Sequence, residues 1–196
     1  VLEYVTFDNN ETEQPASPGG GMHSTNNAPA TFTVAPILTN VTFSNNRSLQ
    51  GGGGGLFNNQ SHAVLTNVTF SGNSAFVRGG AVLNEGSNAV FNNVTFSSNT
   101  APAGTGGAMR NIYSNGVVSS NPVIRNSILW GGSSEEIVTD AGSSVTIDDS
   151  VVQGGCPALG TCTNIAVTDP KLGTLANNGG FTRTVALGFG SSALDT

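Results

Sequence analysis

The sequence has few charged residues, two cysteines and no long apolar run. Only 9% of its 196 residues are charged, against about a quarter in an average globular protein. The six cations are scattered, and nucleic-acid binding needs clustered ones, so we expect no nucleic-acid partner. No apolar stretch reaches the ~18 residues that a membrane-spanning helix requires. The chain starts at Val1 without a signal peptide, so we expect a secreted product whose targeting segment has been removed.

Two good helix formers, Lys and Glu, are also rare. No stretch of ten residues or more has the apolar period of a helix. Val, Thr, Ile and Phe, which favour strands, are plentiful, while Asn, Ser, Thr and Gly take the place of charge at the surface. This composition predicts an all-β protein with a polar, weakly charged surface.

The two cysteines, Cys156 and Cys162, are six positions apart. Two thiols in one short loop predict a local disulfide, which suits an oxidising compartment outside the cell. Two reduced thiols, or half of a metal site, are the alternatives, although His23 and His62 lie far away in the sequence.

Two motifs recur in phase along the chain. The first is x-Val-Thr-Phe with Asn three residues after Phe, and its phenylalanines are spaced by 36, 27 and 26 residues. The phenylalanines are Phe7, Phe43, Phe70 and Phe96, and the asparagines are Asn10, Asn46, Asn73 and Asn99. The second motif, a glycine pair before a small and then an apolar residue, recurs at 19–22, 53–56, 79–82 and 106–109. Repeats of this length predict a solenoid in which neighbouring coils share one core.

We therefore predict a right-handed, single-stranded parallel β-helix of about six to eight coils, stacked about 4.8 Å apart. The repeated phenylalanines should form an inward column, and the asparagines should form a hydrogen-bonded ladder at a corner. The threonines before each phenylalanine should face solvent; they are Thr6, Thr42, Thr69 and Thr95. Residues 1–164 would form the repeats, and 165–196 a C-terminal strand, cap or inter-subunit segment of the same domain.

The paired motifs resemble the repeats of the polymorphic outer-membrane protein family, the chlamydial autotransporter adhesins. The resemblance covers roughly residues 4–110 and is clearest at 70–73 with 79–82 and at 96–99 with 106–109. Segments 127–131, 148–155, 169–173, 177–180 and 191–195 are similar to bacterial surface proteins with right-handed β-helix and choice-of-anchor domains. These resemblances imply a secreted or surface-exposed bacterial protein but no defined activity. We expect an extracellular or cell-surface module with a structural or adhesive role and a host-surface or glycan ligand.

Parallel β-helices also include pectate lyases and polygalacturonases, so a polysaccharide-binding or polysaccharide-cleaving protein is the alternative. The candidate carboxylates are Asp140, Asp148 and Asp149, with Arg125 one coil away as a lyase base. Asp148 and Asp149 are adjacent, so they point to opposite faces unless the strand bends there. The polygalacturonase motifs are missing. We expect no enzyme and no cofactor, with Ca²⁺ at the two adjacent aspartates as an open alternative.

Further side chains suit either a binding or a structural role. Trp130 and Tyr113 would form a carbohydrate platform or pack against loops, and His23 and His62 are expected at the surface. Six glycosylation sequons occur, at Asn10, Asn40, Asn46, Asn59, Asn67 and Asn93. Three of them are Asn-Val-Thr, which the repeat itself explains, so the candidate glycosylation sites are Asn10, Asn46 and Asn59.

The C-terminal segment alternates apolar and polar residues. Phe181, Val185 and Leu187 lie in a run that reads as a strand, and residues 1–7 read as another strand with nothing before it to cap the stack. We hypothesise that the C-terminal strand adds to the first coil of a neighbouring copy. Such a contact does not close and would make a head-to-tail oligomer or fibre.

Overall fold

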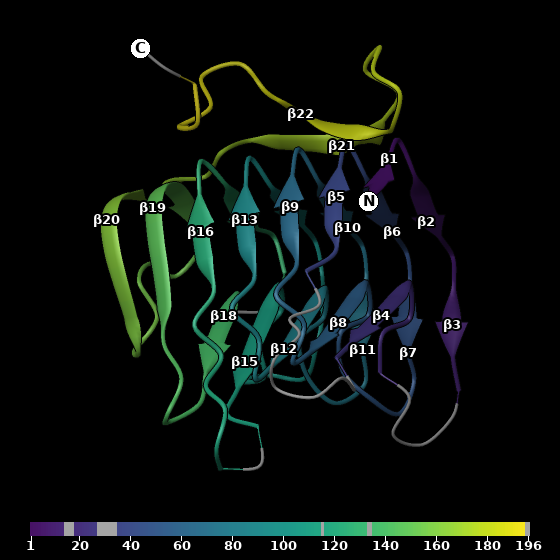
Figure 1. The fold of residues 1–196 in the computed structure, drawn as a ribbon. Coiled ribbons are helices and arrows are strands. Elements are labelled where there is room, and N and C mark those ends of the chain that lie inside the picture. Colours follow the sequence, from purple (N-terminus) through teal and green to yellow (C-terminus); the bar gives the residue numbers. More distant parts are fainter. Residues whose placement is uncertain (14–17, 27–34, 115, 133–134, 195–196) are drawn as a thin grey trace.

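The computed structural model describes residues 1–13, 18–26, 35–114, 116–132 and 135–194. All regular structure in this part is β-strand, and the chain winds into stacked coils (Figure 1). Each strand pairs in parallel with the strand one coil away, apart from a C-terminal antiparallel hairpin. The predicted parallel β-helix is confirmed, because strands distant in sequence are neighbours in an ordered stack.

Successive coils contribute strands to four columns. The first column contains β1 (Leu2–Glu3), β5 (Ile37–Thr39), β9 (Val64–Thr66), β13 (Val90–Asn92) and β16 (Val123–Arg125). The second contains β2 (Thr6–Asp8), β6 (Thr42–Ser44), β10 (Thr69–Ser71), β14 (Thr95–Ser97) and β17 (Ile128–Trp130). The third contains β3 (Glu11–Thr12), β7 (Arg47–Ser48) and β11 (Ser74–Ala75). The fourth contains β4 (Met22–Thr25), β8 (Leu56–Asn59), β12 (Val82–Glu85), β15 (Met109–Ile112) and β18 (Ile137–Thr139).

The first two columns form one sheet folded along a line of left-handed residues. The long strand β19 (Val145–Val152) shows this directly: it pairs with β16 up to Asp148 and with β17 from Val151. Between these stretches Asp149 has a φ of 47°, and the same bend has φ values of 53°, 55° and 54° at Asn40, Asn67 and Asn93. Asn and Asp tolerate this conformation better than other side chains. The asparagine of Asn-Val-Thr-Phe therefore sits at the bend.

The core is a column of stacked rings. Ring centroids lie 4.7 Å apart for Phe7–Phe43, 4.7 Å for Phe43–Phe70 and 5.0 Å for Phe70–Phe96, with interplanar angles of 6°, 6° and 5°. Phe43, Phe70 and Phe96 are completely buried, whereas Phe7 in the first coil is half-buried. Each buried ring contributes about 1.5–3 kcal/mol of hydrophobic stabilisation.

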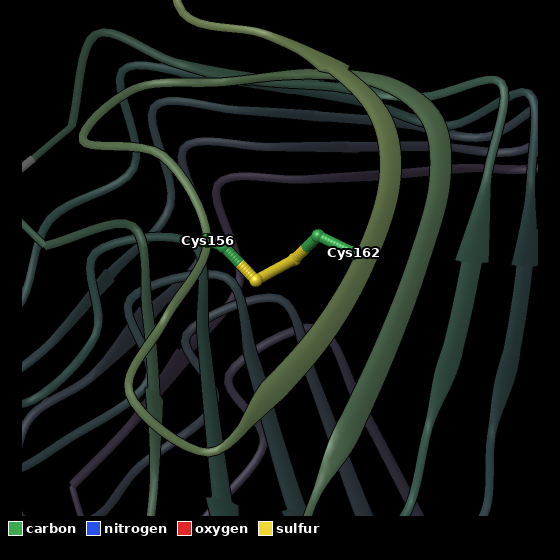
Figure 2. The surroundings of a disulfide bond; sticks show 2 residues. All are labelled: Cys156 and Cys162. Carbon is green, nitrogen blue, oxygen red and sulfur yellow. A yellow bond between two sulfur atoms is a disulfide. The ribbon is translucent and has the colours of Figure 1, made fainter.

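The last coil ends in a strand and a disulfide. β20 (Gly160–Ala166) pairs with β19. This strand contains residue 164, where the sequence analysis placed the end of the repeats. Cys156 and Cys162 are bonded, with an S–S distance of 2.00 Å, and close the loop between the two strands (Figure 2). The predicted disulfide is confirmed, and no free thiol remains.

A C-terminal hairpin returns along the stack. β21 (Leu172–Ala176) and β22 (Thr184–Leu187) pair with each other, and in Figure 1 they lie across the upper edge, from the side of β20 toward β1 and β2. The expectation of solvent exposure is wrong for two of the four threonines, and the hairpin accounts for Thr42. Thr42 is completely buried, and its hydroxyl donates to the Arg183 carbonyl at 2.7 Å. Thr69 is also buried, whereas Thr6 faces solvent as predicted.

Candidate functional site

The asparagines after each phenylalanine form a continuous hydrogen-bonded ladder. The Asn46 side-chain amide donates to Asn73 Oδ1 at 2.9 Å, and Asn73 donates to Asn99 Oδ1 at 2.9 Å. Asn10 joins the outer end through its donation to Asn46 Oδ1 at 2.8 Å. The second amide proton of Asn73 goes to the Phe43 carbonyl at 3.0 Å, one coil back. The ladder thus joins neighbouring coils through uncharged amides that are hydrogen-bonded despite their burial.

A second amide ladder runs through the fourth column and was not predicted. Asn58 donates to Asn84 Oδ1 and Asn84 to Asn111 Oδ1, both at 2.9 Å, and Asn111 donates to Thr139 Oγ1 at 3.1 Å. The three asparagines are completely buried. The sequence signal was an Asn two residues after the apolar residue of each glycine motif, at the same position in three coils.

Serines form a third ladder. The backbone amides of Ser61 and Ser87 each donate to the hydroxyl of the next serine, Ser87 and Ser120, at 3.1 Å. Ser120 continues to Ser143 at 2.9 Å. Each of the three ladders therefore links neighbouring coils along the axis of the stack through uncharged side chains.

The amide ladder ends at a buried carboxyl group. Gly132 follows Leu129 by three residues, as Asn99 follows Phe96, but it has no side chain to continue the ladder. The Glu136 carboxyl group occupies the space instead and accepts from the Gly132 amide at 2.8 Å. Glu136 is 2% exposed, and burial raises its pKa to about 7, against the opposing effect of hydrogen bonds from the Gly132 and Ala108 backbone.

One predicted glycosylation site is wrong. Asn46 is completely buried, and its amide nitrogen already donates to Asn73 and to the Phe7 carbonyl. A glycan on that nitrogen would break both bonds. Asn10 is exposed and Asn59 half-buried, while the bend residues Asn67 and Asn93 are exposed.

The candidate catalytic carboxylates are engaged in ion pairs or hydrogen bonds. Arg125 Nε lies 3.4 Å from Asp148 Oδ2 in the paired strand, as its position one coil away had suggested. The strand does bend at Asp149, which accepts from Asn164 at 2.7 Å, and Asp140 pairs with Arg110. Among the described residues no group of three or more His, Cys, Asp or Glu could hold a metal ion.

The remaining candidates lie apart. Trp130 is half-buried on β17 and Tyr113 is 37% exposed in a loop, and no contact between their rings is present in the described ranges. His62 accepts from the Asn88 amide at 3.0 Å. His23 packs on Phe57, with ring centroids 4.7 Å apart, and the accompanying desolvation lowers its pKa.

The proposed assembly residues have partners within the chain. Phe181 packs on Tyr4 of the first coil, with centroids 4.6 Å apart, although 84% of its surface is still exposed. Val185 and Leu187 lie in β22 and are half-buried. Arg183 lies 3.0 Å from Asp8 of β2. The C-terminal hairpin thus contacts the first coils of its own chain, and assembly between copies stays a prediction.

Two segments of the chain match a known family model. The family model described as the Chlamydia polymorphic membrane protein repeat matches residues 40–59 and 67–85. Both segments are therefore similar to the polymorphic membrane protein repeat. Each contains one strand of the phenylalanine column, the following ladder asparagine and the glycine motif with its strand, so the polymorphic membrane protein repeat corresponds to most of one coil. No curated protein and no solved structure matches the chain. No helix in the described part of the chain is long and apolar enough to cross a membrane.

Proposed function

We propose that this β-solenoid is an extracellular structural and adhesive module of a bacterial surface protein. The observation that carries the proposal is the occurrence of two segments similar to the polymorphic membrane protein repeat inside an uninterrupted parallel stack. A module of this kind acts by presenting a long, stiff surface, and it binds a host-surface or glycan ligand without a catalytic step.

The ladders support the structural part of the proposal. Neighbouring coils in the repeat region are joined by backbone pairing, by stacked rings and by buried Asn and Ser side chains. Hydrogen bonds between neutral groups do not depend on salt, unlike surface ion pairs. The stack therefore suits an environment outside the cell where ionic strength varies, and the disulfide fits an oxidising compartment.

Surface exposure and adhesion need separate tests. An antibody against the folded chain should label intact cells of the source organism, and absence of labelling before permeabilisation would contradict the location. Beads coated with the protein should bind host cells more than beads coated with its reduced and denatured form. Equal binding of the two bead types would leave a structural module without an adhesive role.

Head-to-tail polymerisation is the finer part of the proposal. Leu2, Val5, Phe7 and Met22 of the first coil are only partly buried, and in the proposed fibre the C-terminal strand of a neighbouring copy covers them. Negative-stain electron microscopy of the protein should show filaments with an axial repeat of roughly 30–45 Å, which is six to eight coils at the strand spacing. Dispersed single particles at high concentration would reject the fibre and leave the surface module intact.

A further inference from the structure

A second apolar cluster lies outside the solenoid core. Phe57, Leu83 and Ile112 form it and are 4%, 4% and 9% exposed. Phe57 and Leu83 are register partners on β8 and β12, one residue after the core side chains Leu56 and Val82. Because neighbouring residues on a strand point to opposite faces, this cluster lies on the outer face of the fourth column.

A cavity of about 360 Å³ opens over this cluster. Besides the three apolar residues, its lining includes His23, Arg78 and Glu85. His23 packs its ring on Phe57 and extends the apolar floor. An apolar floor with a few polar groups at its edge is the usual construction of a small-molecule site, and the volume lies near the lower end of such sites.

Arg78 has a position that no other arginine of the chain shares. The other four arginines each lie within 4.0 Å of a carboxylate, namely Arg47 with Glu11, Arg110 with Asp140, Arg125 with Asp148 and Arg183 with Asp8. Among the described residues no such partner is present for Arg78, which is half-buried and lines the cavity. A guanidinium at an apolar cavity is suited to bind a carboxylate through paired N–H donors.

We propose that this cavity binds a small carboxylate with an aromatic or branched apolar body. The apolar body lies on Phe57, Leu83 and Ile112, and the carboxylate pairs with Arg78. Glu85 sets a limit on the ligand. Its Oε1 accepts from Ser114 Oγ at 3.2 Å, and its negative charge disfavours a second anionic group. The site is independent of the adhesive role and uses none of the ladder residues.

The test compares two probes of nearly the same shape, the anion 3-phenylpropanoate and the neutral 3-phenylpropanamide. Both are titrated into ¹⁵N-labelled full-length protein and followed by amide chemical shifts. The acid should bind with a Kd on the order of 1 mM, shift the amides of β8 and β12, and bind about tenfold more tightly than the amide.

Four variants, one of them a control, test whether the charge preference comes from Arg78. Arg78→Gln should reduce acid binding to the level of the amide, whereas Arg78→Lys should keep part of the preference. Glu85→Gln should tighten acid binding. Arg47→Gln removes an exposed arginine elsewhere and should change nothing. Equal affinity for the two probes, an unchanged preference in well-dispersed spectra of Arg78→Gln, or no binding of either probe would overturn the proposal.

Discussion

The coils before residue 113 and those after residue 122 are held together by different contacts. In the earlier coils the same residue types stand above one another, with Phe on Phe and Asn on Asn. In the later coils the phenylalanine column continues as Leu129 and Val152, and Gly132 takes the ladder position after Asn99. Besides the serine ladder, which continues to Ser143, the later coils contain three contacts that occur once each: the Glu136 carboxyl group, the Cys156–Cys162 disulfide and the hairpin. Repetition thus stabilises each coil through its neighbours, whereas an irregular coil needs a local bond of its own.

The largest expected effect is the loss of a ring from the middle of the regular stack. Phe70→Ala should lower the free energy of unfolding by about 3–5 kcal/mol, because a buried ring is lost and a cavity is left between Phe43 and Phe96. Leu129→Ala, in the irregular part, should cost less, since no ring stacking is lost with it. Urea denaturation measures both, and Phe76→Ala, at a ring that is 72% exposed, is the control. A greater cost for Leu129→Ala would contradict the comparison.

Removal of one amide from the ladder should have the next largest effect. Asn73→Ala leaves the buried Asn46 amide without its acceptor and the Phe43 carbonyl without its donor. Buried groups left without partners cost about 1–3 kcal/mol each, so we expect a loss of about 2–4 kcal/mol in unfolding free energy. Asn67→Gly, at the exposed bend, is the control, because Gly adopts the positive φ of this position without strain, and it should cost under about 1 kcal/mol. Similar costs for the two variants would show that ladder burial does not matter.

The carboxyl group that replaces the ladder should make stability depend on pH. Burial raises the pKa of Glu136 to about 7 from an ordinary value of 4.5, so the folded chain holds this proton more tightly than the unfolded chain. Its contribution is therefore fully present below pH 4.5 and is lost as pH rises toward 7, by about 3 kcal/mol in all. Denaturation at pH 5, 6, 7 and 8 measures the slope. In Glu136→Gln this slope should disappear, and a slope equal to that of the unaltered chain would exclude Glu136 as its cause.

The repeats made the fold predictable from the sequence, whereas the contacts that occur only once could not be predicted. Phe43 and Phe70 recur with their asparagines at nearly constant spacing, and this periodicity alone indicates stacked coils. The Asn58 ladder was equally periodic and could have been found the same way. The role of Glu136 could not be predicted from the sequence. Its carboxyl group fills a gap that exists only when Gly132 lies next to Asn99 in the stack. The Arg78 cavity could not be predicted either. It depends on which arginines pair with carboxylates of neighbouring coils, and the strand register decides these pairs.

The smallest expected effect on stability comes from the contact between the C-terminal hairpin and the stacked coils. Arg183 Nη2 donates to Ser44 Oγ at 3.1 Å and pairs with Asp8, whose pKa is lowered by the hydrogen bond from Ser44 and by the Arg183 charge. Both charged groups are partly exposed, so Arg183→Ala should cost at most about 1 kcal/mol of unfolding free energy. Hydrogen exchange should nevertheless quicken in β22 and β2 and stay unchanged in β10 and β14. Arg47→Ala also breaks an exposed pair between the first two coils, but it should leave β22 unaffected, since its partner Glu11 lies in β3. Equal exchange of β22 in both variants would mean that the hairpin is held by other contacts, Tyr4 with Phe181 foremost.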